Sequence, residues 1–278
     1  MNRYRRVMEL NDFLYIGGEV PYYKSRLFDS HGIKHAFFTR NGGVSEGAFS
    51  SLNFAIGTGK VTDSEENVIK NHSIAAKLFG LSETDICRSY QTHTSNVVLA
   101  DNTDRGRGII LPQYENGVDG MVTAERNLLL SIRTADCVPI LLCDTEKRVC
   151  AAVHSGWRGT VGGIAENAVE LMVKQGASRE KIIAAIGPCI NNCCYEVGEE
   201  LYDSFSSAGF DCGLVFEKRG SRYMLDLNTA NKLVLNRAGI ADSNISIAGI
   251  CTKCNSDHFF SHRRDGVIRG TMSAMIHI

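Results

Sequence analysis

The stretch NLLLSIRTADCVPILLCDTEKRVCAAVH, residues 127–154, decides the fold of this chain. It contains three runs typical of buried strands, Asn127–Thr134, Val138–Asp144 and Arg148–His154, and short polar turns separate them. Strands that follow one another directly are not typical of a regular βαβ alternation. The stretch therefore predicts an α+β fold.

Further elements on both sides of this stretch complete the prediction. Strands are expected at residues 35–39, 96–100, 181–186, 223–225, 245–250 and 272–278, and helices at 64–79, 163–175, 197–208 and 228–238. The polar segment 101–119 is expected to be a long surface loop, a kind of loop that often serves as a lid. Only four prolines occur, and no Pro- or Ser-rich linker divides the chain. We therefore expect a layered sandwich of mixed β-sheets with flanking helices, forming a single compact domain over residues 1–278.

The composition limits the functional class. Of the 278 residues, 44% are hydrophobic, which is enough for a sizeable core. The 30 basic residues are balanced by 31 acidic ones, so the chain lacks the excess positive charge that holds a nucleic-acid backbone. No apolar run approaches the roughly 18 residues of a membrane span, and no apolar segment follows the basic N-terminus. We expect a cytoplasmic protein that binds neither nucleic acid nor membrane, and no obligate protein partner is evident.

The ten cysteines are expected to be free thiols or metal ligands, because disulfides are rare in a reducing compartment. The spacing Cys251-x-x-Cys254 and the vicinal pair Cys193-Cys194 leave open a second, structural metal site. A single Cys-x-x-Cys does not identify such a site by itself. Most of the other cysteines are expected to be small buried hydrophobic residues.

Three residues with metal-binding side chains lie at the ends of predicted strands. His93 precedes the strand at 96–100, Cys137 lies in the turn between two strands, and His154 ends a third. If these strand ends meet, two imidazoles and a thiolate form the ligand set of a catalytic zinc, which leaves a fourth position open. The metal would keep the thiol deprotonated and lower the pKa of a bound water toward about 7. On residue types alone, a buried thiol and hydrogen-bonded histidines are an equal alternative, because the wide spacing matches no zinc-finger pattern.

Six motifs occur in the order in which one protein family carries them: Thr39–Ser45, Gln91-Thr-His93, Thr134–Pro139, His154–Thr160, Ile186-Gly-Pro188 with Cys194–Val197, and Phe259–Asp265. From about residue 33 to the C-terminus, the sequence resembles the laccase-domain family. Its members were once called multicopper polyphenol oxidases and are now regarded as purine nucleoside phosphorylases. One departure is His262, where the family pattern commonly has tyrosine.

The resemblance implies a cofactor and substrates. One catalytic Zn²⁺ would be held by His93, Cys137 and His154. Purine nucleosides and phosphate would be the substrates, so that adenosine, inosine and methylthioadenosine are cleaved to the free base and ribose 1-phosphate. Deamination of adenosine would be a companion activity.

Phosphorolysis requires an anion site beside the ribose C1′. The arginines of the motifs are candidates, because a guanidinium fork matches the oxygens of phosphate: Arg40, Arg158, Arg263 and Arg264. Glycine-rich loops at 41–47 and 156–163 are candidates for further N–H donors. The alternative for each arginine is a solvated side chain, and for each loop a simple turn.

Catalytic roles are predicted for Cys137, Asp136 and Arg40. Deamination needs a carboxylate that moves a proton, and the known zinc nucleobase deaminases carry a His-x-Glu motif that this chain lacks. Asp136, next to Cys137, is the substitute we expect, with capping of its turn as the alternative. Trp157, the only tryptophan, is a candidate either to stack on a purine or to anchor its loop.

Three other functions remain open. A His₂Cys set also suits copper, but the eight histidines include no His-x-His pair of the kind that supplies a trinuclear centre, so a copper polyphenol oxidase is disfavoured. In the second alternative, Cys137 attacks a carbonyl with His93 or His154 as base, giving a cysteine- or zinc-dependent amidase that edits peptidoglycan precursors. The third is a non-catalytic binding module.

Overall fold

Residues 127–154 form three consecutive strands, but these strands do not all lie in one sheet. In the computed structural model, which describes residues 7–10, 12–57 and 60–278, they are β8 (Leu129–Thr134), β9 (Val138–Asp144) and β10 (Cys150–Ser155). β9 and β10 pair antiparallel, whereas β8 pairs with β16 (Met272–His277) of another sheet. The turn between β8 and β9 therefore crosses from one sheet to the other.

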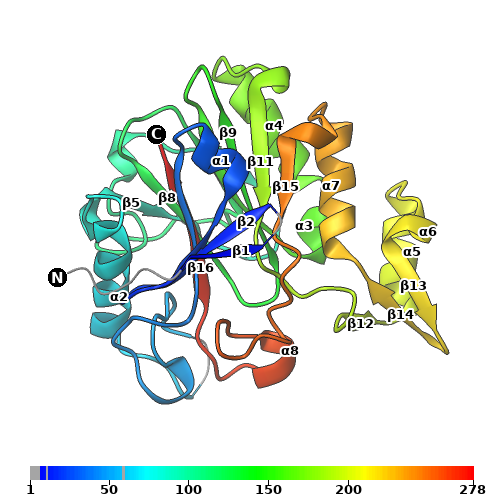
Figure 1. The fold of residues 1–278 in the computed structure, drawn as a ribbon, viewed down its shortest axis with the longest axis horizontal. Coiled ribbons are helices and arrows are strands. Elements are labelled where there is room, and N and C mark those ends of the chain that lie inside the picture. The colour runs from blue at the N-terminus through cyan, green and yellow to red at the C-terminus, as the bar shows by residue number, and fades with distance from the viewer. Residues whose placement is uncertain (1–6, 11, 58–59) are drawn as a thin grey trace.

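Two large sheets make up most of the molecule (Figure 1). The seven-stranded sheet has the order β1-β2-β3-β4-β16-β8-β5, and the six-stranded sheet has the order β15-β11-β9-β10-β7-β6. Both sheets are mixed, because β5 with β8, β11 with β15 and β6 with β7 are parallel pairs among antiparallel ones. The strands not yet defined are β1 (Val7–Leu10), β2 (Phe13–Ile16), β3 (Tyr22–Ser25), β4 (Lys34–Phe38), β5 (Ile86–Arg88), β6 (Val97–Leu99), β7 (Gly120–Thr123), β11 (Ile182–Ile186) and β15 (Ile245–Ile247).

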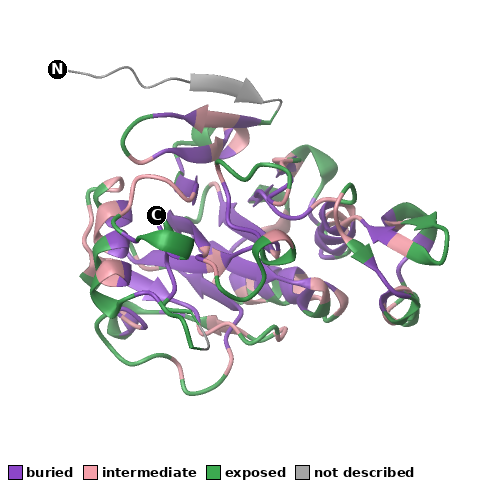
Figure 2. Ribbon diagram, turned by 90° about the horizontal axis from the view of Figure 1, so that it is seen from below, coloured by how far each residue is buried: buried purple, intermediate pink, exposed green. Residues whose placement is uncertain are grey.

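The two sheets pack face to face, and helices cover their outer faces. Successive side chains of a strand point to opposite faces, so β9 sends Leu141 and Cys143 into the core between the sheets. Its neighbours Ile140 and Leu142 enter the core beneath the helices. Every residue of β9 is buried, and Figure 2 shows buried residues gathered along the central strands. The continuous apolar run of this strand is what a strand covered on both sides requires.

Three long helices form the outer layers. α4 (Ile164–Lys174) and α7 (Leu227–Arg237) pack on the six-stranded sheet, and α2 (Glu65–Lys77) packs on the seven-stranded sheet. α2 begins at Ser64, whose hydroxyl accepts a hydrogen bond from the N–H of Asn67. The other helices are α1 (Arg26–Ser30), α3 (Trp157–Val161), α5 (Glu199–Ser207), α6 (Cys212–Val215) and α8 (His262–Asp265).

A small sheet with two helices projects from one side of the sandwich (Figure 1). It has the order β12-β14-β13, with β12 (Glu196–Val197), β13 (Phe216–Arg219) and β14 (Arg222–Leu225). α5 and α6 pack against it. Its first strand, β12, continues a loop that leaves the six-stranded sheet after β11.

The predicted fold class is confirmed: the chain is an α+β layered sandwich of mixed sheets with flanking helices, in one compact domain. Each strand and helix expected from the sequence is present: β9 has the predicted bounds, and the ends of the others are shifted by one to three residues. The sequence pattern did not indicate the shorter elements, namely β1, β2, β3, β5, β7, β12, β13, α1, α3, α6 and α8. These elements are too short to display a period, and long-range pairing rather than local propensity forms them.

The segment 101–119 is the long loop that its polarity predicts. It joins β6 to β7 with one 3₁₀ turn, Asn102–Asp104, and most of its residues are exposed or half-buried. A few of its residues turn inward, among them Asp104, Val118 and Asp119, which are buried. A carboxylate can be buried where hydrogen bonds compensate its lost hydration, as happens at Asp119.

Within the described ranges, no helix has both the length and the apolar character of a membrane span. The basic N-terminus, residues 1–6, on which part of the expected localisation depends, lies outside the described residues. The cytoplasmic location stays a prediction.

Candidate metal centre

The structure brings His93, Cys137 and His154 together. His93 lies in the loop between β5 and β6, Cys137 in the crossing turn between β8 and β9, and His154 near the end of β10. One ligand atom from each residue lies within 4.8 Å of those from the other two. The site therefore forms where the chain passes between the two large sheets.

The three side chains face one another at distances that suit a shared ion. Cys137 Sγ lies 3.8 Å from His93 Nε2, and the two imidazole rings lie 5.0 Å apart between centroids at 78°. His93 has a φ of 63° and Asp136, beside Cys137, a φ of 88°. These left-handed backbone positions are uncommon for residues with a Cβ and often mark functional sites.

Asp119, the last residue of the loop 101–119, organises this centre, and sequence reasoning did not predict this role. Its Oδ1 accepts hydrogen bonds from the ring Nδ1–H of His154 at 2.8 Å and from the backbone N–H of His93 at 3.0 Å. Its Oδ2 accepts from the N–H groups of Thr92 and Thr94, at 3.1 and 2.8 Å. The carboxylate thus holds the His93 loop and commits His154 to the tautomer whose Nε2 is free for a metal. No pattern in the sequence links this aspartate to two distant histidines.

The charges in the site favour the form of cysteine that binds metal. Burial opposes ionisation of the Cys137 thiol, but the charge and hydrogen bonds of His154 and His93 outweigh it and lower the pKa of Cys137 to about 6. For His154, burial by itself lowers the pKa of the ring, but the nearby Cys137 and Asp119 outweigh burial and raise this pKa to about 9. The pKa of Asp119 falls to about 2 despite its burial, because His154 and Thr94 donate hydrogen bonds to it. These shifts favour a Cys137 thiolate next to a protonated His154 ring, and the thiolate is the form of cysteine that binds a metal.

The backbone leaves room for the ligand side chains at Gly156. A Cβ at this position would lie 3.1 Å from Cys137 Sγ and 3.2 Å from His93 Cδ2, closer than ordinary van der Waals contact. Two imidazoles and one thiolate are also the donor set of catalytic zinc sites. The residues present therefore fit a divalent metal ion.

Two cavities adjoin the candidate metal ligands: His93 and Cys137 line both, and His154 lines the second. The first, of about 320 Å³, is lined by His93, Ala135, Asp136, Cys137, Trp157, Arg158, Ile190, Tyr195, Leu227, His262, Arg263 and Arg269. The second, of about 260 Å³, is lined by Ala55, Gly57, Gln91, His93, Arg133, Thr134, Ala135, Cys137, His154, His262, Val267, Arg269 and Thr271. The first is within the size range of small-molecule sites and combines aromatic rings with several cationic groups.

Two of the arginines predicted to bind phosphate line the first cavity. The guanidinium of Arg158 lies 4.2 Å from the ring centroid of Trp157, and that of Arg263 lies 5.0 Å from the ring centroid of Tyr195. Arg269, which sequence reasoning missed, lines both cavities, and its buried Nε has no hydrogen-bond partner.

The other two predicted arginines are held elsewhere. Arg40 donates from Nε and NH2 to the carbonyl of Ser50, each at 3.0 Å, and its guanidinium lies over the ring of Phe260. Arg264 donates to the carbonyls of Thr252, Lys253 and Phe259. Neither arginine is among the described residues that line the two cavities. Irregular loops leave carbonyl groups without secondary-structure partners, and these two guanidinium groups satisfy them.

Asp136 lines the first cavity, but its carboxylate is already engaged. Oδ1 accepts from the hydroxyl of Thr252 at 2.6 Å, and Oδ2 accepts from the hydroxyl of Ser261 at 3.0 Å and the N–H of Arg263 at 2.7 Å. These bonds connect the turn of Cys137 to two loops of the cavity wall. They favour the turn-holding role that the sequence left as an alternative.

The chain matches known proteins along most of its length. Residues 34–278 match the family described as multi-copper polyphenol oxidoreductase laccase. The chain is 40% identical over 244 residues to a Deinococcus radiodurans protein named purine nucleoside phosphorylase, covering 88% of each. It is 36% identical over 241 residues to a protein from an unknown prokaryotic organism named adenosine deaminase RL5, covering 84% of this chain and 90% of the relative. The crystal structure of YlmD from Geobacillus stearothermophilus superposes with a TM-score of 0.84 at 33% identity, covering 97% of each chain.

Proposed function

The chain belongs to the multi-copper polyphenol oxidoreductase laccase family, and from this premise we propose that it is a zinc-dependent purine nucleoside phosphorylase. It cleaves adenosine, inosine and methylthioadenosine with phosphate to the free base and ribose 1-phosphate, and it also deaminates adenosine. The observation that carries the proposal is the convergence of His93, Cys137 and His154 beside a cavity whose wall includes His93 and Cys137 together with arginines and aromatic rings. The names of the relatives described above support the reaction class.

His93, Cys137 and the Nε2 of His154 would hold the zinc. When bound there, the metal would supply a Lewis acid with an open coordination position beside the cavity. Asp119 keeps the His154 ring oriented through its 2.8 Å bond to Nδ1. Gly156 keeps the backbone close to the ligands without crowding them.

The cavity residues support a nucleoside and phosphate side by side. Trp157 and Tyr195 offer ring faces for a purine, and Arg158 and Arg263 offer guanidinium groups for phosphate. In phosphorolysis a phosphate oxygen bonds to the ribose C1′ while the bond from C1′ to the purine nitrogen breaks. The electron pair leaves with the purine, which takes up a proton, and the phosphate gives one up. The positive wall stabilises the anion while this exchange of bonds occurs.

A multicopper oxidase has less support. Within the part of the chain that the structure describes, His93, Cys137 and His154 form the one group containing histidine that could hold a metal ion. Copper oxidation of the laccase type needs a further, histidine-rich centre. Zinc in the His₂Cys set therefore fits the described residues better than copper.

One geometric feature favours a second candidate, a cysteine hydrolase. Cys137, His154 and Asp119 follow one another as nucleophile, base and orienting carboxylate do in a catalytic triad. The named relatives do not favour this reading, and metal dependence separates the two. A hydrolase of this type stays active after metal removal, whereas the proposed phosphorylase does not.

The proposed function is tested by incubating the purified protein with adenosine, with and without phosphate, and separating the products. Adenine and ribose 1-phosphate should form only with phosphate, and inosine reports deamination. Cys137→Ser should abolish both activities. Cys212→Ser should abolish neither, because Cys212 is not part of the metal centre. Adenine formed equally without phosphate would contradict the phosphorylase assignment.

A further inference from the structure

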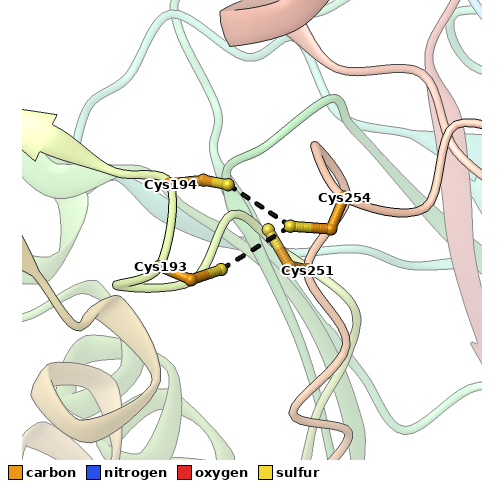
Figure 3. A group of neighbouring side chains, drawn as sticks. All are labelled: Cys193, Cys194, Cys251 and Cys254. Atoms are coloured by element: carbon orange, nitrogen blue, oxygen red, sulfur yellow. Dashed lines mark hydrogen bonds between the residues drawn. The ribbon is translucent and has the colours of Figure 1, made fainter.

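Four cysteines converge outside the centre described above. Cys193 and Cys194 lie in the loop between β11 and β12, and Cys251 and Cys254 lie in the loop that follows β15. Their four sulfur atoms all lie within 4.8 Å of one another. Figure 3 shows the side chains pointing toward one another from the two loops. We propose that these residues, the four-cysteine site, bind a second, structural Zn²⁺ ion.

The sulfur spacing matches a tetrahedral zinc site. Cys254 Sγ lies 3.3 Å from Cys194 Sγ and 3.7 Å from Cys193 Sγ. A Zn–S bond of about 2.3 Å in a tetrahedron places sulfurs about 3.8 Å apart. A disulfide would require about 2.05 Å, and all four cysteines are free thiols. Four protein ligands also close the coordination sphere, which is typical of a structural rather than a catalytic zinc.

The surroundings of the cluster are unlike those of cysteines that only fill a core. Cys193 and Cys254 are exposed, whereas Cys143 and Cys150 are buried among apolar side chains. Core packing therefore does not account for the two exposed thiols of the cluster.

The spacing of the sulfur atoms suits a bound cation. Thiolates whose sulfur atoms lie 3.3–3.7 Å apart repel one another unless a positive ion lies between them. A thiolate-preferring divalent ion such as Zn²⁺ supplies that charge.

The two loops joined by the site also build the wall of the first cavity. Cys189 and Cys251 form an isolated parallel bridge between the loops, and the N–H of Thr252 donates to the carbonyl of Cys189 at 2.9 Å. The first loop carries Tyr195 into the cavity, and the second leads to Arg263. A zinc ion here would fix these two loops relative to each other without touching the substrate.

The proposal is tested by metal analysis after dialysis against a competing chelator. The unmodified protein should hold about two zinc ions per chain. Cys254→Ser and Cys193→Ser should each lose one ion, and Cys137→Ser should lose the other. Cys212→Ser, whose sulfur lies outside the cluster and near the carbonyl of Tyr202, is the matched control and should lose none. The proposal is overturned if Cys254→Ser and Cys193→Ser hold as many zinc ions as the unmodified protein.

A second measurement uses the native chain, so it depends neither on the folding of a variant nor on the proposed enzymatic function. The native protein is treated with iodoacetamide, with and without a strong chelator, and the labelled cysteines are identified by mass spectrometry. Cys193 and Cys254, although exposed, should be protected until the chelator is added. Equal labelling in both conditions, a Cys194–Cys254 disulfide, or iron and sulfide in the purified protein would each overturn the zinc assignment.

Discussion

The substitution Asp119→Asn tests whether the buried carboxylate organises the metal centre. Asp119 is fully buried, and its two oxygens accept from four N–H groups, one of them the His154 ring. An asparagine presents one NH₂ group, which must face either His154 and His93 or Thr92 and Thr94. At least two acceptor interactions are lost in either orientation, because two donors then meet.

The expected magnitude follows from these contacts. Loss of a carboxylate that orients a metal-ligating histidine costs about 10–100-fold in metal affinity, or about 1.4–2.8 kcal/mol. Loss of two hydrogen bonds to a charged acceptor costs about 3 kcal/mol of unfolding free energy in the metal-free protein. Zinc affinity is measured by competition with a chromophoric chelator, and stability by urea unfolding.

Asp144→Asn is the matched control. Asp144 is also fully buried, and its carboxylate accepts from the N–H groups of Glu146, Lys147 and Ser178 at 2.7–2.8 Å. It bonds to no metal-ligand residue. An asparagine whose NH₂ group faces Ser178 loses at least one acceptor interaction, so the substitution should lower the free energy of unfolding by about 1.5 kcal/mol and leave zinc affinity unchanged. Unchanged zinc affinity in Asp119→Asn, or an equal loss in Asp144→Asn, would refute the assigned role of Asp119.

Three further predictions concern the cavity wall, the metal ligands and pH. Arg158→Ala should raise KM for phosphate about tenfold or more. Arg40→Ala should lower the melting temperature and leave KM for phosphate unchanged, because Arg40 donates to a backbone carbonyl. The reverse pattern in steady-state kinetics would support the phosphate-binding role predicted for Arg40 from the sequence. Gly156→Ala should lower zinc affinity without changing the fold, because the added Cβ would lie only 3.1 Å from Cys137 Sγ. Chelator competition measures the zinc affinity, and circular dichroism measures the fold. Unchanged zinc affinity would count against close packing of Gly156 on Cys137. His35 is buried, accepts from the N–H of Ser25 and lies 2.9 Å from the carbonyl of Ile33, and burial lowers its pKa from 6.5 to about 4. Its neutral ring therefore contributes stability that is present above pH 6.5 and is lost as the pH falls toward about 4, with a slope of up to about 1.4 kcal/mol per pH unit. The free energy of unfolding, measured in urea across this range, should depend less on pH in His35→Gln. An equal pH dependence in both proteins would show that His35 is not responsible.

Local patterns were enough to predict the central strands, the helices α2, α4, α5 and α7, and the residue types of the metal centre. The apolar run of β9 and the helical periods of α2 and α4 are properties of neighbouring residues, so they can be read from a short window. The motifs around His93, Cys137 and His154 pointed to the same three ligands that the structure brings together.

Tertiary packing decided which residues from distant parts of the chain come into contact. β8 and β9 are joined by three residues, yet they belong to different sheets, and this crossing places Cys137 between two histidines. In the same packing, Asp119 bonds to the histidines, and Arg40 and Arg264 bond to loop carbonyls. It also brings four cysteines from two loops into one cluster. The sequence by itself determined which side chains prefer the interior and which chemistry they carry. Which of them meet depends on long-range contacts, whose free energy comes from the whole assembled core rather than from any one segment.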